Sequence, residues 1–187
     1  MGRKACPLVV LDSIEWVDTQ SQLRIDRRQD KVDEWAELLK ELDAHAIDTA
    51  KRLTGAPIFD HPFPPIELFT DGGINSPHFI GDGYHRFHTY RKAGRDAIPA
   101  NVTVCEDPRF EAFKFALSAN ATHGIPRTNA DKRNAVRQAL ACERLQGMSL
   151  RELAKVCGVS YQTVSNIKNE DAKGQVSNFD TPHEADT

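Results

Sequence analysis

The sequence has few cysteines and no long apolar run. Its four cysteines, at 6, 105, 142 and 157, lie far apart and form no Cys-x-x-Cys pair. Disulfides and zinc ligation stay open, but scattered buried thiols are the expectation for such spacing, and no metal site is expected. The apolar run Leu8–Leu11 ends at Asp12, too short for a signal peptide or a membrane-spanning helix. We therefore expect no membrane association and a cytoplasmic location.

The chain also has little net charge, because its 24 Lys or Arg and 27 Asp or Glu nearly balance, but these charges are unevenly distributed. The net charge is −3 over 187 residues, which by itself argues against nucleic acid as a partner. Residues 127–168, however, contain eight Lys or Arg and three Asp or Glu, which leaves −8 on the rest of the chain. A local positive field attracts a phosphate backbone. A solvated helix surface would explain the same pattern, so charge alone does not decide.

Hydrophobic periodicity predicts an α+β fold class. Strands are expected at 7–16, 66–70, 78–80 and 97–104, with Asp71–Gly73 as a tight turn. A helix is expected from an Asp30 N-cap through at least Leu42, with a pattern that extends to Leu53 before Gly55, and a second at 85–92. The three prolines in 60–65 predict an extended connector. The order strand, helix, strand, strand, helix, strand predicts a small mixed sheet with helices.

The second half of the sequence predicts an all-α region. A helix is expected at 110–120, ending near Gly124, and another from a Thr128–Asp131 cap to about 146. Trp35 and Phe113 stand at helical spacing among apolar residues and are expected in the core. The predicted organisation is an α/β domain at 1–108, a helical region at 109–170 and a disordered acidic tail at 171–187.

Residues 149–168 carry the spacing of a helix-turn-helix. Ser149 and Glu152 form a capping box, Ala154 permits close helix approach, and Gly158 permits a sharp turn. Val164 and Ile167 are expected to bury the second helix. Its other side is predicted to contact base edges and phosphates. The residues concerned are Ser160, Tyr161, Gln162, Thr163, Ser165, Asn166 and Lys168. The alternative is a helical hairpin of the core that never meets DNA.

A second candidate site is the segment Gly81–Arg86, which joins a strand to a helix. Backbone amides at such a helix start favour an anion, and Arg86 and His85 would add charged donors. Glycine-rich turns of this kind are often purely structural. Asp82 is expected to cap its helix, with positioning of a water for phosphodiester attack as the alternative. His78, His85, His88 and His123 lack carboxylate or cysteine partners at ligand spacing, so no metal centre is expected.

The run from Gly83 to Gly94, followed by the strand residues Ile98–Val102, resembles the ParB/sulfiredoxin superfamily. The matching positions are Gly83, Arg86, Phe87, Arg91, Ala93 and Gly94, with His85 and His88 at two basic positions. Sulfiredoxins carry a catalytic cysteine where this chain has Tyr84, so sulfinic-acid reduction is excluded.

The resemblance implies a nucleotide site, with CTP or ATP and Mg²⁺. A second motif keeps Asn120 but has Ala119 in place of the family's glutamate. Because a hard cation prefers carboxylate oxygen, this replacement argues against metal-dependent hydrolysis. The implied nucleotide- or phosphate-binding residues are Gly81, Gly83, Tyr84, His85, Arg86, Asn120, His123 and Arg127.

Together these features predict a DNA-binding protein of the ParB-like type, with double-stranded DNA as partner. A homodimer would suit a palindromic site, although no heptad indicates one. The rival hypothesis is a DNase or nucleoside triphosphatase acting on plasmid or other DNA, with Asp82, His85 and Arg86 as catalytic residues. A protein-interaction module is a third hypothesis, which leaves the charge segregation unexplained.

Overall fold

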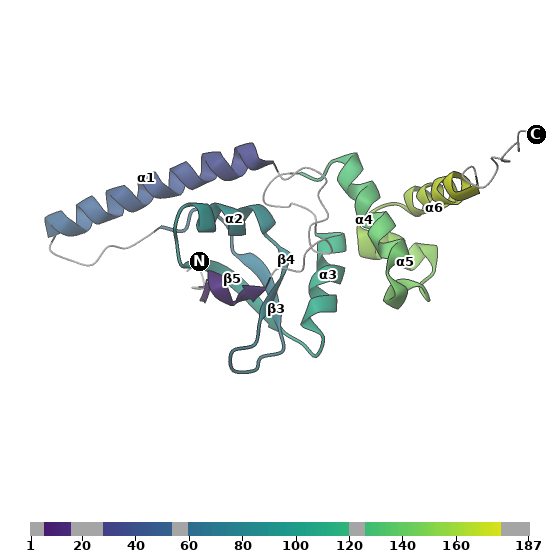
Figure 1. Cartoon of the computed structure of the whole chain (residues 1–187), viewed down its shortest axis with the longest axis horizontal. Helices are drawn as coiled ribbons and strands as arrows, with labels where there is room; N and C mark the ends of the chain where they lie inside the picture. Colours follow the sequence, from purple (N-terminus) through teal and green to yellow (C-terminus); the bar gives the residue numbers. More distant parts are fainter. Residues whose placement is uncertain (1–5, 16–27, 54–59, 120–125, 177–187) are drawn as a thin grey trace, which may run out of the picture. The chain divides into compact units, whose positions relative to one another are not determined.

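The chain forms two compact units, Met1–Ala119 and Asn120–Thr187, in a computed structural model (Figure 1). The structure describes residues 6–15, 28–53, 60–119 and 126–176. The first unit begins with β1 (Leu8–Val10), a 3₁₀ turn at Leu11–Ser13, β2 (Ile14–Glu15) and α1 (Gln29–Leu53). It continues with β3 (Ile66–Thr70), β4 (His78–Asp82), α2 (Tyr84–Lys92), β5 (Ala97–Val104) and α3 (Pro108–Ser118).

The sheet is mixed, as the sequence predicts. Its strand order is β1-β5-β3-β4-β2. β3 pairs with β5 in parallel and with β4 in antiparallel orientation, so β3 lies at the centre. The first predicted strand is interrupted: the 3₁₀ turn at 11–13 separates β1, which pairs with β5, from β2, which pairs with β4 at the opposite edge. Buried Leu11 lies in this turn, so the apolar pattern of 7–16 reflects burial rather than one continuous strand.

The main core of the first unit lies between the sheet and the helices α1 and α2, which pack side by side (Figure 1). Leu39 of α1, Phe87 of α2 and Leu68 of β3 meet in this core. In a second, smaller core cluster, Phe69 and Phe79 of the sheet pack against Ala112 of α3. Because α3 is anchored on the sheet in this way, the division between the units falls after Ala119 rather than after residue 108.

Two features of the first unit differ from the sequence expectation. Helix α1 begins at Gln29, so Asp30 is not the N-cap but lies in the first turn, paired with Arg28 (Nη2–Oδ2 3.1 Å). An acidic residue there still favours the helix through its dipole. Phe113 is buried, as expected, whereas Trp35 is half-buried against Phe63, with ring centroids 5.2 Å apart. The expected helix stops Gly55 and Gly124 lie outside the described residues.

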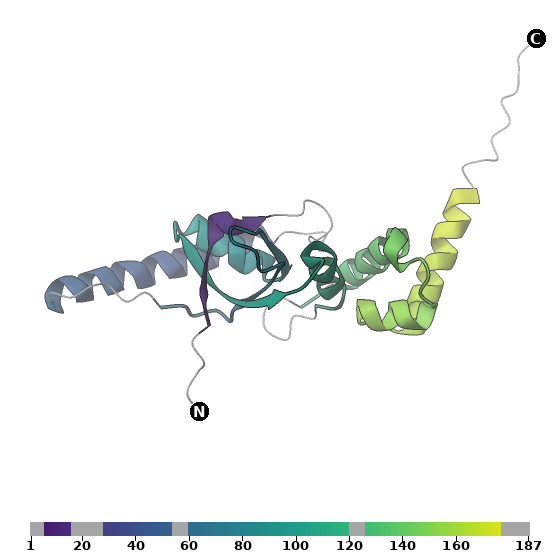
Figure 2. The ribbon, with the colours of Figure 1, turned by 90° about the horizontal axis from the view of Figure 1, so that it is seen from below.

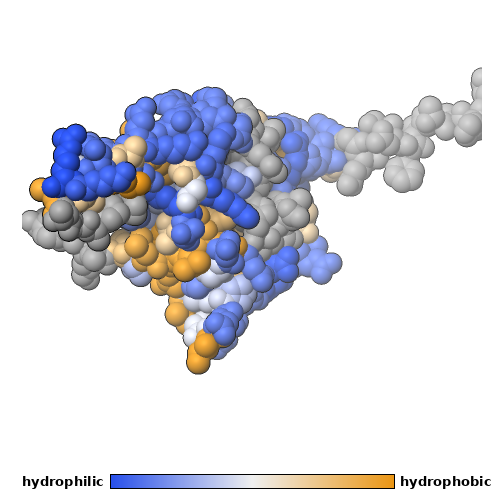
Figure 3. All heavy atoms as spheres, turned by 60° about the vertical axis from the view of Figure 1, so that its left-hand side comes forward, coloured by the Kyte–Doolittle hydropathy of each residue, from blue (hydrophilic) through white to orange (hydrophobic). Residues whose placement is uncertain are grey.

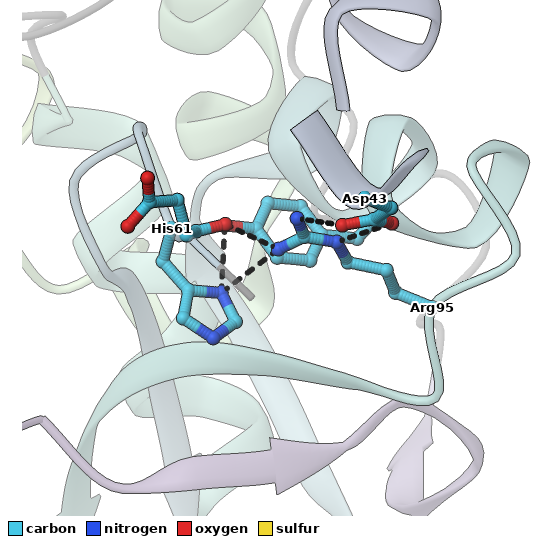
Figure 4. Close-up of polar contacts among 5 residues, drawn as sticks. Asp43, His61 and Arg95 are labelled. Atoms are coloured by element: carbon cyan, nitrogen blue, oxygen red, sulfur yellow. Dashed lines mark hydrogen bonds and ion pairs between the residues drawn. The ribbon is translucent and has the colours of Figure 1, made fainter. Parts of the chain in front are cut away.

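The connector 60–65 forms neither helix nor strand, bends at Phe63, and is joined to the helices by a polar network (Figure 4). The Arg95 guanidinium forks onto Asp43 of α1, with Nε–Oδ2 3.1 Å and Nη2–Oδ1 2.5 Å. Its Nη1 donates to the Asp60 carbonyl (2.7 Å) and to His61 Nδ1 (3.2 Å), which the Tyr90 hydroxyl also approaches at 3.2 Å. Burial and, to a smaller extent, the positive charge of Arg95 lower the pKa of His61. The imidazole therefore stays a neutral acceptor, and burial raises the pKa of Tyr90 to about 12.

The second unit contains α4 (Asn129–Ala141), a 3₁₀ turn at Glu143–Leu145, α5 (Leu150–Cys157) and α6 (Tyr161–Val176). The Thr128–Asp131 capping box is present, but α4 ends at Ala141 rather than near 146, where the 3₁₀ turn follows. Helix α6 continues to Val176, so the expected disordered tail from 171 is wrong over its first six residues. Residues 177–187 of that expected tail lie outside the described part of the chain.

The surface of the first unit carries some exposed apolar side chains. A space-filling view shows an orange, apolar area bordered by hydrophilic surface (Figure 3). Leu8 and Val10 of the edge strand β1 are 56% and 57% exposed, because only Val9 between them faces the core. The helices of the described ranges are either too short or too polar to cross a membrane.

Candidate nucleic-acid interface

The predicted helix-turn-helix is present in the second unit as α5, a tight turn and α6. The Ser149 hydroxyl accepts from the Glu152 amide (3.3 Å), and the Glu152 carboxylate accepts from the Ser149 amide (2.7 Å). The Ser149 hydroxyl also donates to the Glu152 carboxylate (2.8 Å). This bond, with the Ser149 amide bond second, lowers the pKa of Glu152 and keeps its carboxylate ionised. Gly158 takes the left-handed conformation, φ 62°, as the turn requires. Figure 2 shows α5 and α6 meeting at a steep angle.

Helix α6 has the two sides that the sequence predicts. Val164 and Ile167 are fully buried, and Ala154 and Cys157 of α5 and Val136 of α4 are buried as well. The three helices pack on one another. The Cys157 thiol lies near the Ala135 carbonyl, and burial raises its pKa to about 11 against the opposing charge of Arg127. All four cysteines are free thiols; Cys157 is buried and the other three are half-buried.

The opposite side of α6 is polar and open. Tyr161, Gln162, Asn166 and Lys168 are exposed, and Thr163 and Ser165 are half-buried. Ser160 caps the helix, because its Oγ accepts from the Thr163 amide at 3.1 Å. It also shares a hydrogen bond with the Thr163 hydroxyl (2.8 Å). All seven residues predicted for DNA contact thus lie at the N-cap or in the first half of one helix.

The positive charge of the second unit is partly neutralised inside the unit. Arg133 of α4 pairs with Glu170 of α6, and Arg137 pairs with Asp171 (Nη2–Oδ1 3.1 Å). Both acidic residues lie beyond the basic segment 127–168, and the separations of 37 and 34 residues provide no local signal for the pairing. Within the described ranges, Arg151, Lys155 and Lys168 form no ion pair and are exposed.

The Gly81–Arg86 segment of the first unit joins β4 to α2, as predicted, although the strand continues through Gly81 to Asp82. Gly83 is the N-cap, with φ 107° and no side-chain cap, so the expectation that Asp82 caps α2 is wrong. A Cβ on Gly83 would lie 2.3 Å from Ile66 Cγ2, and one on Gly81 would lie 2.6 Å from Phe69 Cε2. Packing within the protein therefore requires both glycines.

Arg86 is turned inward. Its guanidinium is bound by the Pro64 and Pro65 carbonyls (Nη1–O 2.7 and 2.5 Å) and by the Asp82 carboxylate (Nη2–Oδ2 2.8 Å). Three of its five donors are thereby used, and the residue is only 8% exposed. The spacing of Asp82 and Arg86, four residues apart, was a signal for this pair. These contacts brace the connector and do not favour phosphodiester hydrolysis by Asp82, His85 and Arg86.

The aromatic residues of the first α2 turns form a cluster. Tyr84 is half-buried and packs edge-on against His88, with ring centroids 4.4 Å apart, and more distantly against His85 at 5.6 Å. His85 itself is buried, 8% exposed. Of the other residues implied for nucleotide binding, Asn120 and His123 lie outside the described residues. Arg127 belongs to the second unit, where its Nη1 is 3.4 Å from the Cys157 carbonyl.

Comparison with known proteins supports both parts of the structure. Residues 139–175 match a helix-turn-helix family. A possible regulatory protein of the streptomycin biosynthesis operon of Streptomyces griseus is 32% identical over 88 residues, 47% of this chain and 24% of that protein. The transcriptional regulator NovG of Streptomyces niveus is 25% identical over 117 residues, 63% of this chain and 34% of NovG. The chain therefore spans about a quarter to a third of these relatives' length.

Among solved structures, the C-terminally truncated chromosome-partitioning protein ParB from Caulobacter crescentus, complexed to the centromeric parS site, has a similar fold. The TM-score is 0.51 at 13% sequence identity, over 92% of this chain and 78% of that one. At this identity the likeness concerns the fold. The chain accordingly has a ParB-like α+β fold followed by a helix-turn-helix.

Proposed function

We propose that the chain is a DNA-binding regulator that reads double-stranded DNA through α6. The observation that carries this proposal is the division of α6, with Val164 and Ile167 fully buried and Gln162 and Asn166 in solvent. Short and amide-bearing side chains at the start of the second helix suit base edges in a major groove. The names of the Streptomyces regulators and the parS complex of ParB point in the same direction.

Three exposed cations are suited to the phosphate backbone. Arg151 and Lys155 lie on α5 and Lys168 lies on α6, so they flank the polar start of α6 in sequence. The first helix of a helix-turn-helix crosses the backbone while the second enters the groove. Phosphate contacts of this kind supply most of the affinity that does not depend on sequence.

We also propose that the start of α2 holds a phosphate, of CTP or ATP or of DNA. In support, the N-cap Gly83 makes no side-chain hydrogen bond to the first turn of α2, and backbone amides at a helix start favour an anion. Arg86 would act by positioning the segment, since three of its donors are used internally. Among the described residues no group of His, Cys, Asp or Glu could hold a metal ion, and Asn120 lies outside them. A role for Mg²⁺ therefore has no support from the described side chains.

Fluorescence anisotropy with a labelled duplex pool at low salt tests the proposal. The wild-type chain is expected to bind in the micromolar range or tighter, and Lys155→Glu/Lys168→Glu to bind at least about tenfold more weakly. A matched control, Lys40→Glu/Lys51→Glu on α1, makes the same charge change and is expected to bind like the wild type. Absence of wild-type binding to any duplex, or an equal loss in both variants, would overturn the proposal.

The same titration with CTP or ATP, each with and without Mg²⁺, tests the phosphate site. A nucleotide that binds is expected to shift the duplex affinity and to raise the melting temperature of the protein. If neither nucleotide changes either quantity, the nucleotide part of the proposal is wrong and the DNA-binding part stands.

A further inference from the structure

We infer that Gln162 and Asn166 act together as an amide pair that selects adenine in the DNA target. This inference rests on the proposed DNA binding and adds to it the base that is read and the two residues that read it.

The two side chains are joined before any DNA is bound. Gln162 Nε2 donates to Asn166 Oδ1 over 2.8 Å, between positions one turn apart on the exposed side of α6. The bond leaves Gln162 Oε1 as an acceptor and the Asn166 amide nitrogen as a donor. In the major groove adenine offers the complementary set, the N6 amino donor and the N7 acceptor. Because the side chains already hold one another, less rotamer freedom is lost on binding.

The neighbouring hydroxyl side chains are less available than the two amides for hydrogen bonds to a base. The hydroxyls of Ser160 and Thr163 bond to one another at 2.8 Å, and Ser160 also caps the helix, so both are engaged. Ser165 is half-buried.

The cation content of α6 argues against guanine. Guanine is most often read by Arg or Lys. Residues 161–168 contain no arginine, and their one lysine, Lys168, stands at the eighth helix position. The first turns of α6, which in a helix-turn-helix contact base edges, therefore carry amides and no cation.

Selection from a random duplex library tests the inference. The wild type is expected to enrich a site with an invariant adenine, and replacement of that adenine by guanine is expected to weaken binding roughly 5- to 150-fold. Gln162→Ala and Asn166→Ala should each lose this preference at the same position. Because the two side chains act as one unit, the double variant should lose no more than either single variant.

Controls and a gain-of-function variant complete the experiment. Asn129→Ala and Gln146→Ala remove exposed amides of the same unit outside α6 and are expected to keep the adenine preference. Asn166→Arg is expected to move the preference toward guanine, which a misfolded variant could not do.

The outcomes separate the two proposals. If both alanine variants keep the wild-type adenine preference, or if the wild type binds all duplexes equally, the adenine inference is overturned and DNA binding stands. If the wild type retains no duplex, both proposals fall.

Discussion

Several side chains near the start of α2 are engaged inside the protein, and this changes the interpretation of the Gly81–Arg86 segment. From the residue types alone, Arg86 and Asp82 are an anion ligand and a helix cap. In the structure they pair with one another, and Arg86 holds the carbonyls of Pro64 and Pro65. Buried polar groups form hydrogen bonds with the groups that packing brings near them. Residue type alone does not identify these partners.

Gly83 gives a prediction at this scale. Gly83→Ala is expected to lower the free energy of unfolding by about 2 kcal/mol or more, because φ is 107° and the new Cβ would lie 2.3 Å from Ile66 Cγ2. Gly94→Ala is the matched control: its φ is 80°, but nothing lies within 4 Å of the added Cβ. At Gly94 only the cost of the left-handed conformation should lower the free energy of unfolding, by about 1 kcal/mol. Urea denaturation measures both, and an equal loss would contradict the packing argument.

At the scale of elements, two ion pairs join the α1 helix to the segment that contains α2, and they differ in burial. Asp43–Arg95 is largely buried, with side chains 19% and 8% exposed, whereas Asp33–Lys92 lies at the surface with 49% and 42%. A charge left without its partner costs much more in the interior than in water. Burial, rather than the ion pair as such, is what distinguishes them.

Arg95→Met is accordingly expected to reduce the free energy of unfolding by about 3 kcal/mol. The substitution leaves the buried Asp43 carboxylate without its ion-pair partner and removes the hydrogen bond to the Asp60 carbonyl. Lys92→Met removes the surface ion pair between α2 and α1 and should reduce the free energy of unfolding by about 0–1 kcal/mol. Chemical denaturation of the two variants checks this. If the losses were equal, the network around Arg95 would not anchor α1.

At the scale of the whole molecule, the net charge of −3 does not reveal that residues 127–168 are locally positive. In the structure, ion pairs within the second unit neutralise part of this positive charge. Glu170 and Asp171 of α6 neutralise Arg133 and Arg137 of α4. Fewer cations are therefore left for phosphate contacts than the sequence count of eight suggests. Binding strength and its salt dependence depend on the cations that remain, not on the total.

Salt titration distinguishes paired from available cations. Lys168→Ala is expected to reduce the slope of log Kobs against log salt concentration by about one, as for the loss of one phosphate contact. Arg133→Ala removes an arginine that is already paired with Glu170 and should leave the slope unchanged. Anisotropy titrations over a series of salt concentrations measure both slopes. A reduction by Arg133→Ala as large as that by Lys168→Ala would mean that Arg133 contacts DNA.

Features that depend on near neighbours along the chain could be predicted from the sequence. The capping boxes at Thr128 and Ser149, the left-handed turn at Gly158 and the buried pair Val164 and Ile167 are all present as predicted. Each depends on residues within a few positions along the chain, so local pattern and propensity suffice.

Polar contacts between residues far apart in the sequence could be identified only in the folded chain. The bonds of Arg86 to the Pro64 and Pro65 carbonyls, the bonds of Arg95 to Asp43 and the ion pairs between α4 and α6 join residues 21 to 52 positions apart. Such contacts exist because packing of the core brings distant elements together, and no local pattern carries that information. The predicted interface of α6 survives in the structure because its polar side is defined by the apolar side that the core requires.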